Sequence, residues 1–247
     1  MTGHRGETGT IAGVDGCRAG WIALVQTAGS DPRVEIRRSF ADLVNGLGAG
    51  AVIAVDMPIG LPDKISGAGR GPEQMVRPFL GARQSSVFSI PARGAVEAQS
   101  YAEACAKALE TSDPPRKVSK QAFFLFAKVL EIDALLRADA GLRARVIECH
   151  PEFSFCRLNG DAPMQTPKKI KGAVNPAGIA ERVALLERYG LDGSLFAKAP
   201  PRGAAMDDLV DAAVNLVMAR RHTEGRTRPF PDPPLQDRHG LRVAIYG

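Results

Sequence analysis

Short apolar runs alternate with amphipathic stretches along the chain, and this order predicts an α/β fold. The apolar runs expected to form strands lie at residues 10–15, 21–26, 34–38, 51–56 and 145–148. The first two should pair as an antiparallel hairpin, because only the short segment GCRAG separates them. A short helix at 40–47, ending at Gly48, then makes a crossover, so the strand at 51–56 should run parallel to the first.

Longer amphipathic stretches predict helices around this sheet. They are expected at residues 101–110, 119–137, 178–189 and 204–222. Residues 57–100 show little periodicity and many prolines and glycines, which indicates an irregular excursion after the fourth strand. Together these elements predict a mixed five-stranded sheet in the order 3-2-1-4-5, with strand 2 antiparallel and helices on its faces.

The same pattern divides the chain into three parts. Residues 1–9 are expected to be a disordered tail, and residues 10–225 one domain that contains the insertion and helices of residues 57–140. Residues 226–247 form a proline-rich C-terminal extension with one short strand, LRVAIY. No apolar run is long enough to suggest a membrane span, and the first residues lack the apolar core of a signal peptide.

Three of the predicted parallel strands end in an acid. Asp15 ends the first strand, Asp56 the fourth and Glu148 the fifth. The carboxyl ends of parallel strands lie at one edge of a sheet, which is where open α/β folds place their sites. We therefore expect these three carboxylates to face a common crevice.

The predicted helix at 204–222 adds further acids. Asp208, Asp211 and Asn215 fall on one face of a helix whose other positions are mostly apolar. Asp207 is explained by the helix start, where an acid meets free N–H groups, and Asp208 fits the same explanation less well. Asp211 lies one turn inside, between apolar neighbours, so its carboxylate needs a partner or a cation.

The composition is that of a globular chain with a basic surplus. The 247 residues carry 32 Lys and Arg against 27 Asp and Glu, a formal charge of +5, which favours an anionic partner. The 4 cysteines form no CxxC pair, so neither a disulfide framework nor a zinc ribbon is indicated, and a reducing cytoplasm fits best. Candidate contacts for an anionic ligand are Arg70, Arg77, Arg83, Arg93, Lys168, Lys169 and Lys171.

Five sequence segments carry a resemblance to a known family. VDGCRAGW, VDMPIGLP, LGARQSSVFSIPAR, ECHPEFSFCRLNG and MDDLVDA, in this order, resemble an uncharacterised bacterial family (domain of unknown function 429) whose members are catalogued as predicted nucleases of the RNase H fold. The resemblance covers the chain from Ile11 to Ala219. It implies an RNase H-like domain that cleaves phosphodiester bonds of nucleic acid with the help of Mg²⁺ or Mn²⁺.

The resemblance also implies which residues hold the metal. In the RNase H-like superfamily, acids on the first strand, the fourth strand and the last helix bind metal. Glu148, on the fifth strand, departs from the RNase H acid on the first helix, where this chain offers only Asp42. The catalytic and metal-binding residues expected on this basis are Asp15, Asp56, Glu148, Asp208 and Asp211.

The chemistry of such a cluster favours a cation. Two carboxylates about 4 Å apart repel by roughly 4 kcal/mol at an effective dielectric constant of 20. Two Mg²⁺ or Mn²⁺ ions about 3.5–4 Å apart would offset this repulsion and could clamp the attacking and leaving oxygens of a phosphodiester. The basic residues around the site, among them Arg83, Arg93, Lys168, Lys169 and Lys171, would then contact further phosphates.

Other interpretations stay open at this point. His150 and Glu152 could support the metal site, but Pro151 equally predicts an ordinary helix start there. A non-catalytic nucleic-acid-binding or protein-binding domain of the same fold is an alternative. A third is an actin-like or sugar-kinase ATP-binding domain, although that class expects two duplicated halves and a hydroxyl or lysine in the phosphate turn. The sequence also leaves the nucleic acid substrate and the oligomeric state open, a homodimer included.

Overall fold

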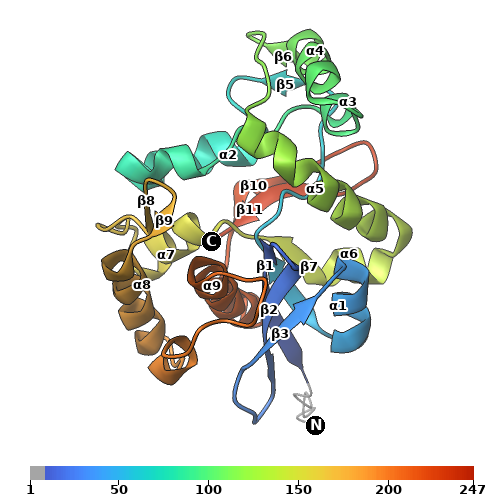
Figure 1. Cartoon of the computed structure of the whole chain (residues 1–247). Coiled ribbons are helices and arrows are strands. Elements are labelled where there is room, and N and C mark those ends of the chain that lie inside the picture. Colours follow the sequence, from blue (N-terminus) through green and yellow to red (C-terminus); the bar gives the residue numbers. More distant parts are fainter. Residues whose placement is uncertain (1–8) are drawn as a thin grey trace.

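A computed structural model describes residues 9–247; residues 1–8, which make up most of the predicted N-terminal tail, lie outside the described part. Its centre is a mixed seven-stranded sheet with the order β10-β11-β7-β4-β1-β2-β3 (Figure 1). The strands of this sheet are β1 (Thr10–Cys17), β2 (Gly20–Thr27), β3 (Arg33–Arg37), β4 (Val52–Val55), β7 (Val146–Glu148), β10 (Pro229–Gln236) and β11 (Arg242–Tyr246).

The α/β class and the order of the predicted strands are found within this sheet, but a count of five strands was too low. The predicted strands correspond to the neighbours β3-β2-β1-β4-β7, with β4 and β7 parallel to β1 and β2 antiparallel to it. Beyond β7, β11 adds in parallel and β10 pairs with β11 in antiparallel fashion. β10 comes from the proline-rich segment PFPDPPLQ, which an edge strand accepts because one side of its backbone has no partner strand.

Helices cover both faces of the sheet. The long helices are α4 (Tyr101–Thr111), α5 (Lys120–Ala138), α8 (Pro176–Arg188) and α9 (Met206–Thr223). The shorter ones are α1 (Phe40–Leu47), α2 (Gly71–Val76), α3 (Arg93–Val96), α6 (Ala140–Arg145) and α7 (Pro151–Leu158). None of the helices within residues 9–247 combines the length and the apolar character needed to cross a membrane.

The segment between β4 and α5 is more ordered than its sequence predicts. It contains α2, α3 and α4, the 3₁₀ segment η1 (Arg77–Ser86) and a small parallel pair of β5 (Ile65–Ser66) with β6 (Ser112–Asp113). Figure 1 shows α3, α4, β5 and β6 grouped beyond one end of the sheet. Of the three helices in this segment, α4 was predicted, whereas α2 and α3 have only six and four residues, too few turns to show a periodic pattern.

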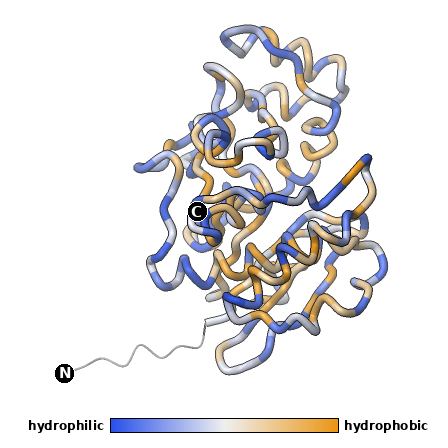
Figure 2. Tube along the Cα trace, turned by 90° about the vertical axis from the view of Figure 1, so that its left-hand side faces the viewer, coloured by the Kyte–Doolittle hydropathy of each residue, from blue (hydrophilic) through white to orange (hydrophobic). Residues whose placement is uncertain are grey.

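Alternate residues of the central strands pack into two cores. Ala12 and Val14 of β1 and Val55 of β4 belong to the core that includes α1 and α5. Ala54 of β4 and Ile147 of β7 belong to the core that includes α8 and α9. In Figure 2 hydrophobic positions follow these strands and the helices around them, while hydrophilic stretches mark outer loops. The two-residue period of a strand therefore decides which helix layer each side chain faces.

Gly13 lets α9 lie directly on the sheet. A Cβ at this position would be 1.9 Å from the backbone nitrogen of Leu216 and 2.1 Å from the carbonyl oxygen of Ala212. Any residue other than glycine would therefore collide with the helix backbone. At the same contact, the Asn215 side-chain amide donates a hydrogen bond of 3.0 Å to the Val14 carbonyl. The contacts at Gly13 and Val14 thus fix the position of α9 against β1 directly before Asp15.

Candidate metal-binding site

Two of the predicted acids are neighbours at the ends of parallel strands. Val14 of β1 pairs with Val55 of β4, and the next residues are Asp15 and Asp56. The Asp56 N–H donates to the Val14 carbonyl at 3.0 Å, which continues the ladder to this point. Because Val14 and Val55 face the α1/α5 core, strand alternation turns Asp15 and Asp56 to the α9 side.

Helix α9 brings the third acid to the same place. Asp211 lies one turn into the helix, buried, on the face that Gly13 allows to approach β1. Carboxylate oxygens of Asp15, Asp56 and Asp211 all lie within 4.8 Å of one another. These three residues, called the acid triad below, were predicted from the sequence, and the structure brings them together.

Burial and mutual repulsion make the acid triad hard to keep ionised. Burial, and after it Asp211, raises the pKa of Asp56 to about 8. Burial likewise raises the pKa of Asp211 to about 6, against the lowering effect of Lys168. The pKa of Asp15 is well above its ordinary value because of burial and then the charges of Asp56 and Asp211. A cation close to all three carboxylates would stabilise their charged forms.

Two lysines supply positive charge at this position. Lys168 forms an ion pair with Asp211, and Lys169 forms one with Asp207. Burial lowers the pKa of Lys168, but Asp211 and Glu152 raise it more, so it lies above its ordinary value. Lys169 begins the small hairpin of β8 (Lys169–Ile170) and β9 (Ala173–Val174), which lies outside the strands and helices predicted from the sequence. Both lysines were predicted as phosphate contacts, and here each is paired with an acid of α9.

Glu148 does not join the acid triad. It pairs in register with Val55, one residue short of Asp56, so its side chain faces the opposite side of the sheet. There Arg70 binds both carboxylate oxygens, at 2.5 and 3.2 Å, and the Ile59 N–H adds a bond of 2.7 Å. Burial raises the pKa of Glu148 to about 7, while Arg70 opposes this shift. The prediction of Glu148 as a metal ligand is therefore corrected, because both of its carboxylate oxygens bind Arg70 in a buried ion pair.

The acid that caps the start of α9 is Asp208 and not Asp207. Asp208, predicted as a ligand, accepts the Ala205 N–H at 2.8 Å and so caps the helix start. Asp207, expected to be the cap, is 3% exposed, and one of its oxygens has no hydrogen-bond partner among the described residues. Burial raises the pKa of Asp208 above its ordinary value. Asp208 lines the same cleft as the acid triad, but it is not one of the three acids whose oxygens lie close together.

Of the other candidate residues, Glu152 and His150 are bonded within the protein and Asp42 is exposed. Asp42 is exposed in the first turn of α1. Glu152 is buried and binds Arg182 through both oxygens, at 2.7 and 2.8 Å. His150 caps α7, accepting the Phe153 N–H with Nδ1 at 3.3 Å, while Nε2 lies 3.2 Å from the Ser86 carbonyl and must be the protonated nitrogen. Burial lowers the pKa of His150 to about 4, which keeps the ring neutral.

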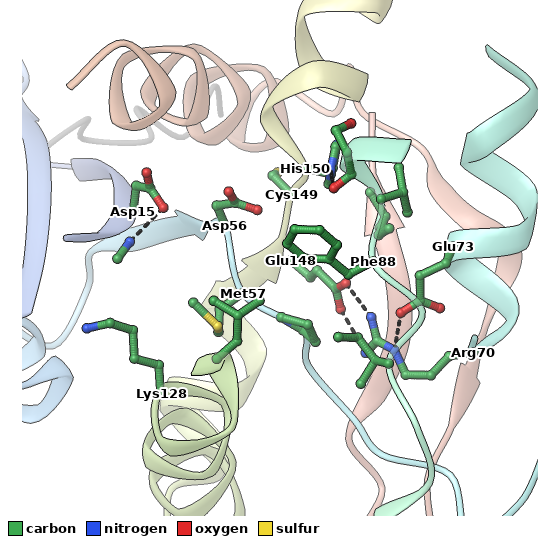
Figure 3. Close-up of a pocket in the computed structure, with 17 residues that line it drawn as sticks. Asp15, Asp56, Met57, Arg70, Glu73, Phe88, Lys128, Glu148, Cys149 and His150 are labelled. Atoms are coloured by element: carbon green, nitrogen blue, oxygen red, sulfur yellow. Dashed lines mark hydrogen bonds and ion pairs between the residues drawn. The ribbon is translucent and has the colours of Figure 1, made fainter. Parts of the chain in front are cut away.

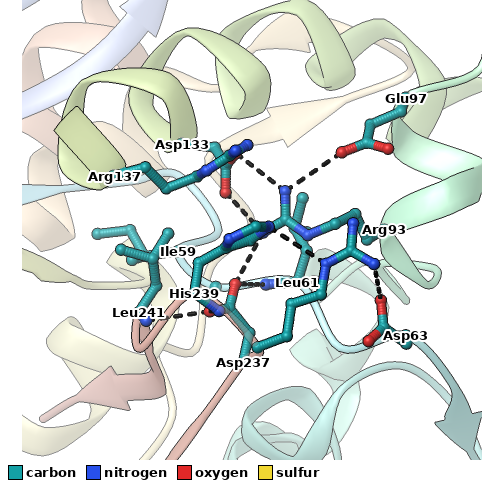
Figure 4. Close-up of polar contacts among 12 residues, drawn as sticks. Ile59, Leu61, Asp63, Arg93, Glu97, Asp133, Arg137, Asp237, His239 and Leu241 are labelled. Carbon is teal, nitrogen blue, oxygen red and sulfur yellow. Dashed lines mark hydrogen bonds and ion pairs between the residues drawn. The ribbon is translucent and has the colours of Figure 1, made fainter.

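The candidate phosphate contacts divide into buried and accessible residues. Arg93 is 1% exposed and binds Asp133 and Asp237 at 2.8–2.9 Å (Figure 4). It therefore joins the insertion to the C-terminal strands and is not available to a ligand, which corrects its prediction. Arg70 is buried in the same way. Arg83 donates to the Gln165 carbonyl at 2.7 Å, and Lys171 is exposed.

Two hollows open beside the acid triad, and Asp15 and Asp56 line both. The acid cleft has a volume of about 290 Å³ and includes Asp211, Lys168 and Lys169. The side cavity has a volume of about 170 Å³ and extends toward the Arg70–Glu148 ion pair. Figure 3 shows the two aspartates at one end of the side cavity and this ion pair at the other. No sequence pattern indicates the side cavity, because its lining comes from seven separate parts of the chain.

The sheet order and the acid triad together define an α/β protein with a carboxylate site at the ends of its central parallel strands. A family model described as "Protein of unknown function (DUF429)" matches residues 13–236, and the chain belongs to this family. The family expected from the five sequence segments is thereby confirmed. Comparisons with curated proteins and with solved structures gave no match.

Proposed function

We propose that this protein is a divalent-metal-dependent nuclease of RNase H-like fold, which hydrolyses phosphodiester bonds of nucleic acid at the acid triad. The observation that carries the proposal is the convergence of Asp15, Asp56 and Asp211. These residues are distant along the chain, yet their oxygens lie within 4.8 Å of one another in a cleft. Glu148 and Glu152 each bind an arginine, whereas Asp15 and Asp56 form no ion pair among residues 9–247 and share only the Lys168 that is paired with Asp211.

The donor set fits a hard divalent cation. All three ligands are carboxylate oxygens, which Mg²⁺ and Mn²⁺ prefer. The Oδ1 atom of Asp211 is buried and has no hydrogen-bond partner among residues 9–247, so it is free to take a ligand. A divalent ion held by the triad would supply positive charge to a phosphate and would lower the pKa of an attacking water.

The triad offers ligands for one ion directly, whereas the mechanism expected from the sequence uses two. A second ion would need Asp207 or Asp208. One oxygen of Asp208 is taken by the Ala205 N–H, but its other oxygen is not bonded to the helix start. Asp207 has one oxygen paired with Lys169 and one without a partner. The two-ion form of the proposal therefore depends on these two residues and not on Glu148.

Basic residues around the acid cleft would hold the substrate. Lys169 is half exposed at its rim, with 48% of its side chain accessible, and Lys171 follows in the same hairpin. Arg83 is bonded to Gln165, in the segment that leads to Lys168. Phosphate contacts of this kind fix a strand in position but read no sequence. Lys168, paired with Asp211, would keep some positive charge at the reacting phosphate.

The proposal is tested by incubating the purified protein with Mn²⁺ and single-stranded, duplex, hybrid and branched oligonucleotides. We expect cutting that EDTA abolishes and that Asp15→Asn lowers by at least a hundredfold, with folding checked by thermal unfolding. Asp42→Asn is the matched control, since this exposed aspartate lies outside both hollows. Cutting by Asp15→Asn at the wild-type rate would contradict the proposal, and so would ATP turnover without any strand cleavage.

A further inference from the structure

The side cavity differs in character from the acid cleft. Asp15 and Asp56 form one wall, where the acid triad is, but most of the remaining surface is apolar. The apolar side chains that line it include Met57, Val87, Phe88, Ile90, Leu125 and Ile245. An apolar surface next to the proposed phosphate site would favour an uncharged part of the substrate, because contact between the two removes apolar surface from water.

The size of the side cavity limits what can enter. Its volume of about 170 Å³ is below the roughly 300–1,000 Å³ of pockets that enclose drug-sized ligands. A single ring system fits this limit, whereas a base pair does not. In a nucleic acid strand, the uncharged groups next to each phosphate are the sugar and the base. A base bonded to the sugar beside the cut phosphate is therefore the matching occupant.

Phe88 gives this occupant a stacking partner. Its side chain lines both hollows, and the residue remains 37% exposed although it is large and apolar. Figure 3 shows its ring between Asp56 and the Arg70 ion pair. The segment that carries it is held in place, because the Val87 carbonyl accepts two bonds from Arg77, at 3.2 and 3.0 Å. A fixed, exposed ring is a platform on which a base can stack.

Most polar groups of the side cavity are already bonded within the protein; an exception is the buried Oε2 of Glu73, which has no hydrogen-bond partner among the described residues. Each guanidinium nitrogen of Arg70 is bonded to Glu148, Glu73 or backbone carbonyls. Lys128 donates to the Gly20 carbonyl at 2.5 Å and lies 4.5 Å from the Trp21 ring centroid. The Ser86 hydroxyl donates to the Arg83 carbonyl at 2.8 Å. Few groups are left to read the edge of a base, so any base could be accepted.

We propose that the side cavity receives one unpaired base of the nucleic acid strand whose phosphate lies at the acid triad, by stacking on Phe88 and without base selectivity. This inference rests on the proposed nuclease function. It makes the preferred substrate a single strand, or a site at which a base is unpaired. A fully paired duplex would first have to extrude a base, which costs a few kcal/mol.

The test uses Mn²⁺, a single-stranded oligonucleotide, its duplex form and a set of strands that lack one base near the cut. Stacking on an aromatic ring contributes about 1–3 kcal/mol per base, or roughly 5- to 150-fold in kcat/KM. We expect a fall of this size for duplex, for the strand without the flanking base, and for Phe88→Ala on the intact strand. Phe88→Ala should not lower cutting of the abasic strand further, because the two changes remove the same contact.

A second measurement does not depend on cutting. A strand with 2-aminopurine at the flanking position is bound to the Asp15→Asn variant, and its fluorescence is compared with that of the Asp15→Asn, Phe88→Ala double variant. Stacking on Phe88 quenches the emission, so the double variant should be brighter. Phe124→Ala in place of Phe88→Ala is the matched control, because Phe124 is 78% exposed and lines neither hollow.

The outcomes separate this inference from the function on which it rests. Mn²⁺-dependent cutting that is equal for duplex and single strand, and that ignores both the missing base and Phe88→Ala, would overturn the inference and leave the nuclease proposal standing. Unchanged fluorescence in the double variant would overturn it as well. If the wild-type protein cuts no nucleic acid at all, both proposals fail.

Discussion

The contact between Gly13 and α9 gives the sharpest prediction about how the site is built. In Gly13→Ala the new Cβ would lie 1.9 Å from the Leu216 nitrogen and 2.1 Å from the Ala212 carbonyl oxygen. Ordinary contacts are about 3.5 Å, so β1 and α9 must separate by roughly 1.5 Å. Overpacking a core costs about 1–3 kcal/mol and sometimes more. Because both neighbours are backbone atoms that cannot rotate away, we expect a loss of about 3 kcal/mol or more.

The same shift should damage the metal site. Asp211 lies on α9 and Asp15 on β1, so separating these elements opens the acid triad, whose oxygens now lie within 4.8 Å. We expect Mn²⁺ affinity, measured by titration calorimetry, to fall at least tenfold. The free energy of unfolding in urea should fall by about 3 kcal/mol, and the Tm by about 6–12 °C for a chain of this size.

A second glycine provides the control. Gly50 has nothing within 4 Å of its ideal Cβ, and its φ lies outside the left-handed region. Gly50→Ala should change the stability by less than about 0.5 kcal/mol and leave Mn²⁺ affinity unchanged. If Gly13→Ala is as stable as Gly50→Ala and binds Mn²⁺ as tightly as the wild type, then close packing of α9 on β1 does not build the site.

Three further predictions concern charges in and around the site. Lys168→Met removes the cation that is paired with Asp211 and that repels a metal ion there. We expect Mn²⁺ to bind at least tenfold more tightly, measured by calorimetry. Weaker binding would show that the lysine helps to hold the metal site together. Arg70→Met leaves Glu148 buried without its partner and should lower the free energy of unfolding in urea by about 3–5 kcal/mol. The double variant with Glu148→Gln should recover part of this loss. An Arg70→Met variant as stable as the wild type would contradict the ion-pair assignment. Burial and Asp211 raise the folded-state pKa of Asp56 to about 8, so the folded protein binds this proton more tightly than the unfolded chain does. In EDTA, stability should therefore fall as the pH rises from about 5 toward 8, and Asp56→Asn should flatten this slope; identical slopes for both proteins would refute the shift.

The sequence located the acid triad because two simple patterns apply. Asp15 and Asp56 each follow an apolar run, and a helical crossover makes these runs parallel, so their ends must share one edge of the sheet. Asp211 was predicted because a carboxylate among apolar helix positions is buried and needs a partner or a cation. All three inferences depend on local patterns and on chain direction, which a sequence contains.

Glu148 shows where such patterns fail. A run of buried apolar residues gives no alternation, so the sequence does not tell which face each residue takes. The register places Glu148 beside Val55 and Cys149 one residue later, on the α8/α9 side. A shift of one residue reverses the direction of every side chain in a strand. The partner of Glu148, Arg70, lies 78 residues away, and no periodic pattern connects the two.

The last strand, LRVAIY, was predicted and is found as β11, but β10 and the lysine pairs depend on long-range contacts. PFPDPPLQ has the composition of a loop, and it becomes β10 only because β11 offers an edge to pair with. Lys168 and Lys169 lie in a short basic stretch, which usually remains solvated. Their partners Asp211 and Asp207 come from another element of the fold. Tertiary pairing, more than local preference, decided each of these features.

The central claim is that Asp15, Asp56 and Asp211 form one divalent-metal site. The most direct test is a crystal of the wild-type protein soaked in Mn²⁺, with anomalous diffraction data recorded above the manganese absorption edge. The account predicts an anomalous peak within about 2.0–2.4 Å of oxygens from all three carboxylates, with Lys168 moved away from Asp211. An acid triad that holds no manganese while Lys168 stays bound to Asp211, or a peak on other residues, would contradict it.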